Sequence, residues 1–262
     1  LYDLAFLLMD LEHRELGDFA NVVLNRYLDL TGEDDGLPAM PLFLSSRAAI
    51  RAHVTATVLE RTAGSGSRPA MAAEARRYLD LSAQYLRARS RRLVAIGGLS
   101  GTGKSTLAAA LASSLGARVV RSDVIRKQSF GVALETPLPP AAYAPEASHR
   151  VYETLRRRAR DALEAGYSVI VDAVSLKPEE RQSFAAIAAA SAVPFSGLWL
   201  EAPAATMERR LRVRRHDASD ASPEVLAQQL QQDPGAPDWV RVDASGGAAD
   251  CLAAARRALA LG

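Results

Sequence analysis

Residues 97–106 read Gly-Gly-Leu-Ser-Gly-Thr-Gly-Lys-Ser-Thr, and this stretch decides the fold. From Gly98 to Ser105 it matches the pattern G-x-x-x-x-G-K-[ST] at every fixed position. An apolar run at residues 93–96 precedes it, and an alanine- and leucine-rich helical pattern follows it, which is the context that this motif requires. The stretch predicts a phosphate-binding loop between a strand and a helix. The structural alternative is a glycine-rich turn that binds nothing.

The residue types of this loop explain how it would hold a nucleotide. Glycines let the backbone fold tightly, so that successive N–H groups point at phosphate oxygens, and the helix N-terminus adds partial positive charge. Lys104 would bring its ammonium to the β- and γ-phosphates as a catalytic residue, and the Ser105 hydroxyl would ligate Mg²⁺. The residues expected to bind ATP are Gly98, Ser100, Gly101, Thr102, Gly103, Lys104, Ser105 and Thr106.

Composition excludes several other classes of protein. The 262 residues are 48% hydrophobic and 24% charged, which is too apolar for a disordered chain. One cysteine, Cys251, permits no internal disulfide and favours a cytoplasmic location, and no 18-residue run is apolar enough to span a membrane. The net charge of +2 does not demand nucleic acid, so such a partner is not expected but stays open. Lysine is scarce, with 3 residues among 32 basic ones, so Lys104 carries more weight than any single arginine.

The chain changes character at Arg91. Before it, apolar residues recur at helical spacing, with a flexible break at residues 64–67, so residues 1–90 are expected to be all-helical. After it, apolar strand patterns alternate with helical ones, which predicts an α/β fold with a parallel sheet covered on both faces. Strands are expected at about 93–96, 117–121, 167–172, 194–200 and 239–243, and helices at about 104–115, 145–165, 177–191, 203–215, 223–232 and 248–261.

Two aspartates follow predicted strands. Asp172 ends the apolar run 169–171, where a carboxylate can hold Mg²⁺ through water. Asp123 follows the strand at 117–121, so it would lie at the carboxyl edge of the sheet, where ligands bind in open α/β folds. There it could accept a hydrogen bond from a substrate hydroxyl and orient that hydroxyl for attack. The alternative for both residues is a helix N-cap.

Five arginines lie within residues 209–215. Arg210 and Arg214 are four positions apart, hence on one face of a helix, and arginines in a lid can neutralise the charge on a phosphoryl group in transit. Both are therefore candidate catalytic residues, with Arg215 as a further candidate. The alternative is a solvated helix face in an arginine-rich protein.

Other residues favour ordinary structural roles. Arg126, Lys127 and Arg181 lie near predicted strand ends, where surface solubility explains them as well as function does. Trp199 and Trp239 fall in strand patterns and are expected in the core. The histidines show no spacing typical of a metal site: His13, His53, His149 and His216.

The later part of the chain resembles a family of small P-loop kinases related to zeta toxins, gluconate kinase, chloramphenicol phosphotransferase and polynucleotide kinases. The stretches that carry the resemblance are residues 98–106, 122–123, 169–173 and 217–221, the last reading Asp-Ala-Ser-Asp-Ala. It covers about residues 91–262 and implies a nucleoside-kinase-like fold of the AAA-type ATP-binding class. It also implies Asp123 as the substrate-activating base, Asp172 in the metal shell, and Arg210 and Arg214 in a lid.

The first segment is similar to another family. Residues 1–11, Leu-Tyr-Asp-Leu-Ala-Phe-Leu-Leu-Met-Asp-Leu, look like the stretch after the metal-binding aspartate of aminoglycoside-phosphotransferase-like kinases. The resemblance implies that residues 1–90 are the remnant of such a domain's C-terminal lobe, fused to a P-loop kinase domain at 91–262. Without the rest of that domain, residues 1–90 would do no chemistry alone.

Together these features predict an ATP- and Mg²⁺-dependent phosphotransferase that acts on a hydroxyl of a small molecule. A regulatory nucleotide-binding ATPase without an acceptor and a polynucleotide 5′-hydroxyl kinase are the alternatives. The acceptor pocket is expected around residues 126–150, which contain no readable specificity pattern, and the sequence indicates no oligomeric state.

Overall fold

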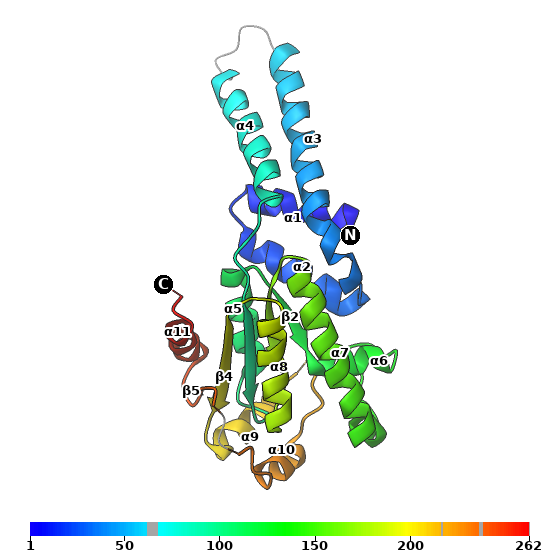
Figure 1. Ribbon diagram of the computed structural model, residues 1–262, viewed down its shortest axis with the longest axis vertical. Coiled ribbons are helices and arrows are strands. Elements are labelled where there is room, and N and C mark those ends of the chain that lie inside the picture. The colour runs from blue at the N-terminus through cyan, green and yellow to red at the C-terminus, as the bar shows by residue number, and fades with distance from the viewer. Residues whose placement is uncertain (62–67, 216, 236–237, 262) are drawn as a thin grey trace.

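A computed structural model describes residues 1–61, 68–215, 217–235 and 238–261 of the chain (Figure 1). The expected break at 64–67 and His216 lie outside the described residues. Among those described, five parallel strands form one sheet in the order β2-β3-β1-β4-β5. The strands are β1 (Leu93–Gly98), β2 (Ala117–Arg121), β3 (Ser168–Asp172), β4 (Phe195–Glu201) and β5 (Val240–Asp243). The predicted α/β class, a parallel sheet flanked by helices and preceded by a helical region, is confirmed.

Helices cover both faces of this sheet. Along β1, Leu93 and Ala95 pack into one apolar core, while Val94 and Ile96 pack into the other, as the alternation of side chains along a strand requires. The first core is closed by α7 (Pro145–Glu164) and α8 (Pro178–Ala190), and the second by α5 (Lys104–Leu115) and α11 (Ala248–Ala258). Three shorter helices lie near the carboxyl ends of the strands: α6 (Ser122–Ser129), α9 (Ala204–Val213) and α10 (Pro223–Leu230).

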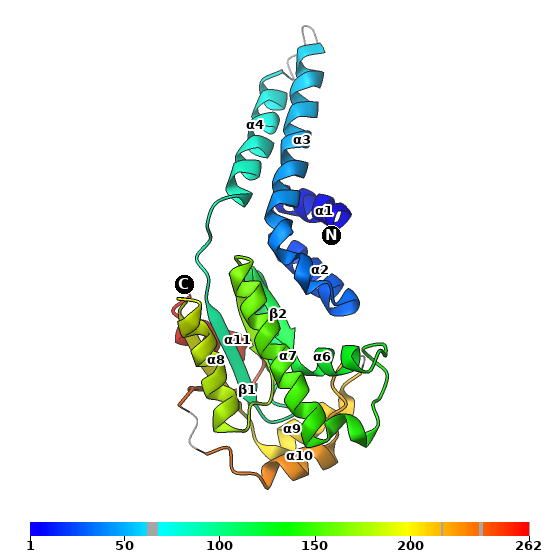
Figure 2. The ribbon, with the colours of Figure 1, turned by 45° about the vertical axis from the view of Figure 1, so that its right-hand side comes forward.

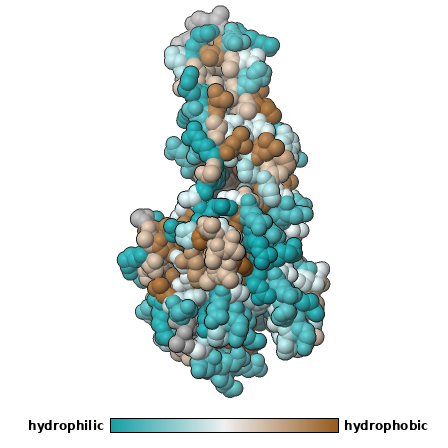
Figure 3. All heavy atoms as spheres, viewed as in Figure 1, coloured by the Kyte–Doolittle hydropathy of each residue, from teal (hydrophilic) through white to brown (hydrophobic). Residues whose placement is uncertain are grey.

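The segment before the sheet is helical, as expected. It comprises α1 (Tyr2–His13), α2 (Gly17–Thr31), a 3-10 turn η1 (Asp34–Ala39), α3 (Met40–Arg61) and α4 (Arg68–Tyr85). Helices α3 and α4 pair into a hairpin that projects away from the sheet. Helix α2 lies between this hairpin and the sheet, near β2 (Figures 1 and 2). Apolar side chains are spread over the exposed surface of the hairpin (Figure 3). No helix within the described ranges is long and apolar enough to cross a membrane.

Side chains from α2 occupy the free edge of β2. The amides of Asn21 and Asn25 donate to the Ala117 carbonyl at 3.0 and 2.9 Å, and the Val119 N–H donates to Asn25 Oδ1 at 2.8 Å. An unpaired strand edge invites pairing with another chain, and these amides satisfy the backbone groups that would permit it. The helical segment is therefore built into the sheet's edge.

A buried ion-pair network fixes the same junction. Arg118 of β2 is buried and contacts Asp29 and Asp34, each at 2.7 Å. Arg158 of α7 approaches Asp34 at 3.3 Å, so two carboxylates from the helical segment meet two guanidinium groups from the α/β part. Arg118 belongs to β2, so this junction holds the strand that leads into residues 122–123.

Candidate active site

The loop at 98–103 has the backbone that its glycines predict. Gly98, Gly101 and Gly103 have φ of +132°, +85° and +97°, values that residues with an L side chain rarely adopt. A Cβ on Gly101 would lie 2.6 Å from the Met207 carbonyl oxygen, whereas a Cβ on Gly103 would meet nothing within 4 Å. Gly101 therefore permits close packing against α9, and Gly103 shapes the turn into α5.

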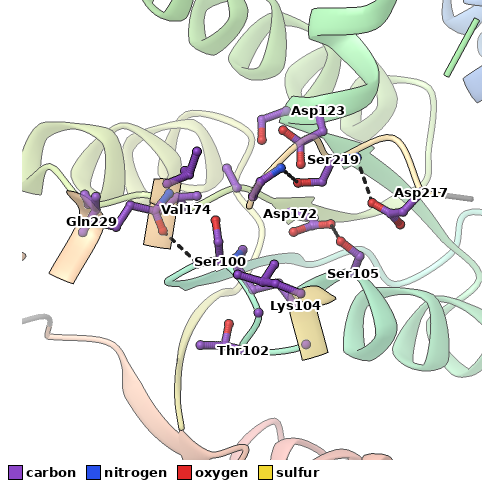
Figure 4. A pocket seen from close by; sticks show the side chains of 18 of the residues that line it. Ser100, Thr102, Lys104, Ser105, Asp123, Asp172, Val174, Asp217, Ser219 and Gln229 are labelled. Atoms are coloured by element: carbon purple, nitrogen blue, oxygen red, sulfur yellow. Dashed lines mark hydrogen bonds between the residues drawn. The ribbon is translucent and has the colours of Figure 1, made fainter. Parts of the chain in front are cut away.

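Lys104 and Ser105 start α5 and face the end of β3. Lys104 Nζ donates to the Leu99 carbonyl at 3.0 Å, and the Ser105 hydroxyl donates to Asp172 at 2.6 Å (Figure 4). Desolvation lowers the pKa of the Lys104 ammonium, and the carboxylates of Asp172 and Asp123 oppose this shift. Lys104 therefore interacts with both carboxylates, and Ser105 is hydrogen-bonded to one of them, Asp172.

The residues expected at the metal fit Mg²⁺ chemically. A hydroxyl and a carboxylate 2.6 Å apart are the hard oxygen ligands that Mg²⁺ prefers, and this ion commonly takes few protein ligands and completes its shell with phosphates and water. In the described ranges, no group of three or more His, Cys, Asp or Glu side chains could hold a metal.

Arg121, which no sequence motif indicated, contacts the same residues, Ser105 and Asp172. Its guanidinium donates to Asp172 at 3.2 Å, to the Ser105 hydroxyl at 3.0 Å and to Asp217 at 3.1 Å. It ends β2 immediately before Ser122-Asp123, so the strand that carries the candidate base also carries this cation. Only the strand pairing of Arg121 with Asp172 could have indicated the contact.

Asp123 is a half-buried carboxylate that lines the same cavity. It lies in the first turn of α6, whose N-cap is Arg121, so the N-cap alternative does not describe it. Desolvation raises its pKa, while a hydrogen bond with the Ser219 side chain opposes the shift. Asp172 also does not cap a helix, because α8 begins only at Pro178.

The arginine-rich segment contributes two of its arginines to the cavity, Arg210 and Arg214. Arg210 donates to the Thr102 carbonyl at 3.4 Å and to the Gly246 carbonyl at 2.9 Å. Helix α9 ends at Val213 rather than at 215, so Arg214 lies at its C-cap in an extended conformation and not on the helix face shared with Arg210. Both still line the cavity, whereas Arg215 only donates to the nearby Arg212 and Arg214 carbonyls.

Both aspartates of the Asp-Ala-Ser-Asp-Ala segment, residues 217–221, accept hydrogen bonds from other parts of the chain. Asp217 accepts from Arg121 at 3.1 Å, and Asp220 accepts from Lys127 and Tyr143, each at 2.6 Å. Arg214 donates to the Ser219 and Ala221 carbonyls at 2.9 and 2.7 Å. Spacing alone did not reveal these roles, because these partners of the two aspartates lie 77 to 96 residues away in the chain.

Three basic residues that surface solubility could explain are buried instead. Lys127 pairs with Asp220, and Arg181 donates to the backbone carbonyls of Ser175, Leu176 and Pro234. Arg126, one turn after Asp123, is also buried and lines the cavity. Trp199 and Trp239 lie in the core, as expected.

One cavity of about 1290 Å³, large enough for a nucleotide and a second small molecule, is lined by Lys104, Ser105, Asp123, Asp172, Arg210 and Arg214. The loop residues 100–106 line one part of it (Figure 4). Another part, where the acceptor pocket is expected, is formed by α6 and α7 through residues that include Asp123, Arg126, Ser148 and Tyr152. From α10, Gln229 accepts a hydrogen bond from the Ser100 N–H at 2.9 Å, a contact that no motif indicated.

Comparison with known proteins agrees with this layout. A family model described as an AAA domain matches residues 93–233. Two curated relatives are the uncharacterized proteins Rv2004c of Mycobacterium tuberculosis and Mb2027c of Mycobacterium bovis. Each is 32% identical over 229 residues, which are 86% of this chain and 45% of the relative, so the chain spans about half the length of these proteins.

Solved structures that resemble the chain include two kinases. A gluconokinase from Sinorhizobium meliloti is 23% identical with a TM-score of 0.48, and the match covers 66% of this chain and 93% of that one. The Mycobacterium tuberculosis APS kinase CysC in complex with AMPPNP and APS is 20% identical with a TM-score of 0.46, covering 66% and 99% of the two chains.

Proposed function

The chain belongs to the AAA domain family matched over residues 93–233, and from this premise we propose that it is an ATP-dependent phosphotransferase acting on a hydroxyl of a small molecule. The observation that carries the proposal is Asp123. This half-buried carboxylate lines the same cavity as the phosphate-binding loop, and it neither caps a helix nor forms an ion pair with a described residue. A nucleotide switch would need a residue that positions water, whereas a carboxylate in the cavity suits an alcohol acceptor.

The proposed reaction uses each group in turn. The backbone N–H groups of residues 103–105 hold the phosphates, and Asp123 accepts the proton of the acceptor hydroxyl as the hydroxyl oxygen bonds to the γ-phosphorus. The bond from the γ-phosphorus to the β–γ bridging oxygen breaks, and ADP leaves. Lys104, Arg210 and Arg214 stabilise the charge on the phosphoryl oxygens. Mg²⁺, held by Ser105 and Asp172, would supply further charge neutralisation.

The experiment is a transfer assay on the full chain. ATP labelled at the γ-phosphate is incubated with a panel of hydroxyl compounds, and labelled product is separated from inorganic phosphate. We expect Lys104→Ala and Asp123→Asn to lose transfer by at least about a hundredfold, on the scale of one electrostatic or acid–base group. Arg150→Ala, at an exposed residue outside the cavity, is the control and should keep full activity.

Three results would contradict the proposal. Undiminished turnover in Lys104→Ala would remove the phosphate-binding loop from the reaction. Phosphate release that no acceptor stimulates and that Asp123→Asn leaves unchanged would favour a regulatory ATPase. Transfer to the 5′-hydroxyl of an oligonucleotide, with strongly salt-dependent binding, would favour a polynucleotide kinase.

We further propose that residues 1–90 descend from the C-terminal lobe of an aminoglycoside-phosphotransferase-like domain, with residues 91–262 as the kinase domain. The support is the resemblance of residues 1–11, and the family match begins only at residue 93. In this proposal the first segment supplies no chemistry, because the cavity is lined by residues 100–251. We place the enzyme in the cytoplasm, where ATP is abundant.

A further inference from the structure

Gln229 of α10 accepts a hydrogen bond from a backbone group of the phosphate-binding loop. The Ser100 N–H donates to its Oε1 atom at 2.9 Å (Figure 4), and Ser100 is only 7% exposed. By contrast, the Thr102 N–H donates to the Leu99 carbonyl within the loop itself. One N–H group of the loop is therefore held by a side chain that lies 129 residues away in the chain.

The peptide group that carries this N–H also contacts the Lys104 ammonium. At its other end is the Leu99 carbonyl, which accepts from Lys104 Nζ at 3.0 Å and from the Thr102 hydroxyl at 2.8 Å. A trans peptide is planar, and its N–H and C=O point in opposite directions, so fixing the direction of one fixes the other. Gln229 and Lys104 thus bond to opposite ends of one rigid group, the 99–100 peptide.

Packing brings α10 next to the loop but does not set the orientation of this peptide. Leu226, three positions before Gln229, is fully buried against α9, and the Leu99 side chain packs on the same apolar cluster. Glycines at positions 98 and 101 flank the peptide, both with positive φ, and glycine gives the backbone wide conformational freedom. Because apolar contacts have no direction, the hydrogen bonds at the two ends of the peptide fix its orientation.

We propose that Gln229 is a positioning residue, which holds the 99–100 peptide so that its carbonyl directs the Lys104 ammonium toward the phosphates of the nucleotide. The inference deepens the proposed function and rests on it for the role of Lys104 in transfer. A buried N–H needs an acceptor in any case, but this one belongs to the peptide that accepts from the lysine. Without the glutamine, the peptide is free to turn, and the ammonium loses its fixed acceptor.

Two NMR signals report this arrangement in the full chain without any transfer reaction. The chain has three lysines, so lysine labelled with carbon-13 at Cε gives three signals, and Lys104→Arg identifies one of them by its loss. The Ser100 amide is followed by hydrogen exchange. In Gln229→Met, which has a similar length but no strong acceptor, we expect the amide to exchange at least about tenfold faster and the Lys104 signal to move. The signals of Lys127 and Lys177 should stay in place.

Matched variants separate positioning from folding. Gln231→Met removes the same amide from an exposed residue at the end of α10 that does not line the cavity, and both signals should then match the wild type. Gln229→Glu keeps an acceptor oxygen at the same place along the side chain, so the Ser100 amide should stay protected. If Gln229→Met does not fold, as judged by its melting temperature, Gln229→Asn supplies the comparison, because its amide is one methylene shorter.

The kinetics of transfer give a readout that a merely structural role would not produce. A misplaced Lys104 stabilises the phosphoryl group in transit less well, while the N–H groups of residues 103–105 still bind the phosphates of ATP. We therefore expect Gln229→Met to lower kcat at least about tenfold and to change the KM for ATP by less than about threefold. Gln229→Glu should recover part of the loss in kcat.

Three results would overturn the inference. They are a Ser100 amide whose exchange Gln229→Met leaves unchanged, a Lys104 signal that does not move, and a raised KM with an unchanged kcat, which would indicate a loop that is only loosened. If the wild type transfers phosphate to no acceptor, the proposed function fails instead. The two NMR signals then still decide whether Gln229 positions Lys104.

Discussion

Substitutions at Gly101 and Gly103 of the phosphate-binding loop should distinguish the cost of backbone strain from the cost of steric overlap. Both have positive φ, but only at Gly101 would an added Cβ press on the Met207 carbonyl. We expect Gly103→Ala to lower the free energy of unfolding by about 1–2 kcal/mol from strain alone. Gly101→Ala should cost more, because α9 must move as well. Urea unfolding of both variants tests this order, and equal losses would show that contact with α9 is unimportant.

Asp123 should cost stability at neutral pH. Its pKa in the folded chain is raised, chiefly by desolvation, so the ionised form is less favourable there than in the unfolded chain. The stability that protonated Asp123 contributes is present below the unfolded pKa and is lost as pH rises through the raised folded value. Asp123→Asn should therefore unfold at higher urea than the wild type at pH 7.

The same reasoning fixes the pH dependence of that difference. As pH falls through the raised pKa of Asp123, the wild-type carboxyl becomes neutral and resembles the asparagine, so the stability difference should shrink. Denaturation curves of both proteins at pH 7 and near pH 4 give the two differences. A difference that grows on acidification, or a variant that is less stable at pH 7, would contradict the raised pKa.

At the residue scale, sequence reasoning succeeded where a motif or a strand end constrains a side chain. Residues 100–106, Asp123 and Asp172 line the cavity at the carboxyl edge of the sheet, whereas Gly98 is not among the residues that line it. The roles of Arg126 and Lys127 stayed open, because surface solubility explains an arginine or lysine taken alone as well as function does. Their burial depends on partners such as Asp220, 93 residues from Lys127, and no local pattern reveals such a partner.

At the scale of elements, α2 and η1 support the strand that carries the candidate base. Asp34 of η1 contacts Arg118 of β2 at 2.7 Å, with both side chains buried. Asp34→Asn removes one of the two carboxylates that neutralise Arg118 and the carboxylate that contacts Arg158, so it should lower the free energy of unfolding by about 3 kcal/mol. The exposed pair between Glu201 and Arg241 is the control, and Glu201→Gln should cost less than about 1 kcal/mol.

Salt gives this element-scale prediction a second measurement. Screening acts on exposed charges, so the loss in Asp34→Asn should be the same at 0.05 and 0.5 M salt, within about 0.5 kcal/mol. A loss that disappears at high salt would mean that the pair is solvated.

The periodicity of residues 1–90 predicted helices correctly, but helical periodicity does not show which strand edge a helix will cover.

For the whole molecule, the boundary at residues 90 and 91 remains a prediction about domains, and the contacts across it make a different prediction about folding. One apolar core includes Leu24 and Leu28 of α2 together with Leu155 of α7. Side chains of α2 also satisfy the edge of β2, and Asp29 and Asp34 neutralise Arg118. A fragment of residues 91–262 would lose all of these contacts at once.

We therefore expect the fragment 91–262 to unfold at lower urea than the full chain and to self-associate through its exposed β2 edge. Size-exclusion chromatography and urea unfolding measure the two effects. The matched control replaces residues 55–73, the far end of the α3–α4 hairpin, with a short Gly-Ser linker. That variant keeps α2 and η1, so it should stay monodisperse and unfold within about 1 kcal/mol of the full chain. A monomeric fragment as stable as the full chain would instead make residue 90 a folding boundary, because the helices before it would then contribute nothing that the sheet requires.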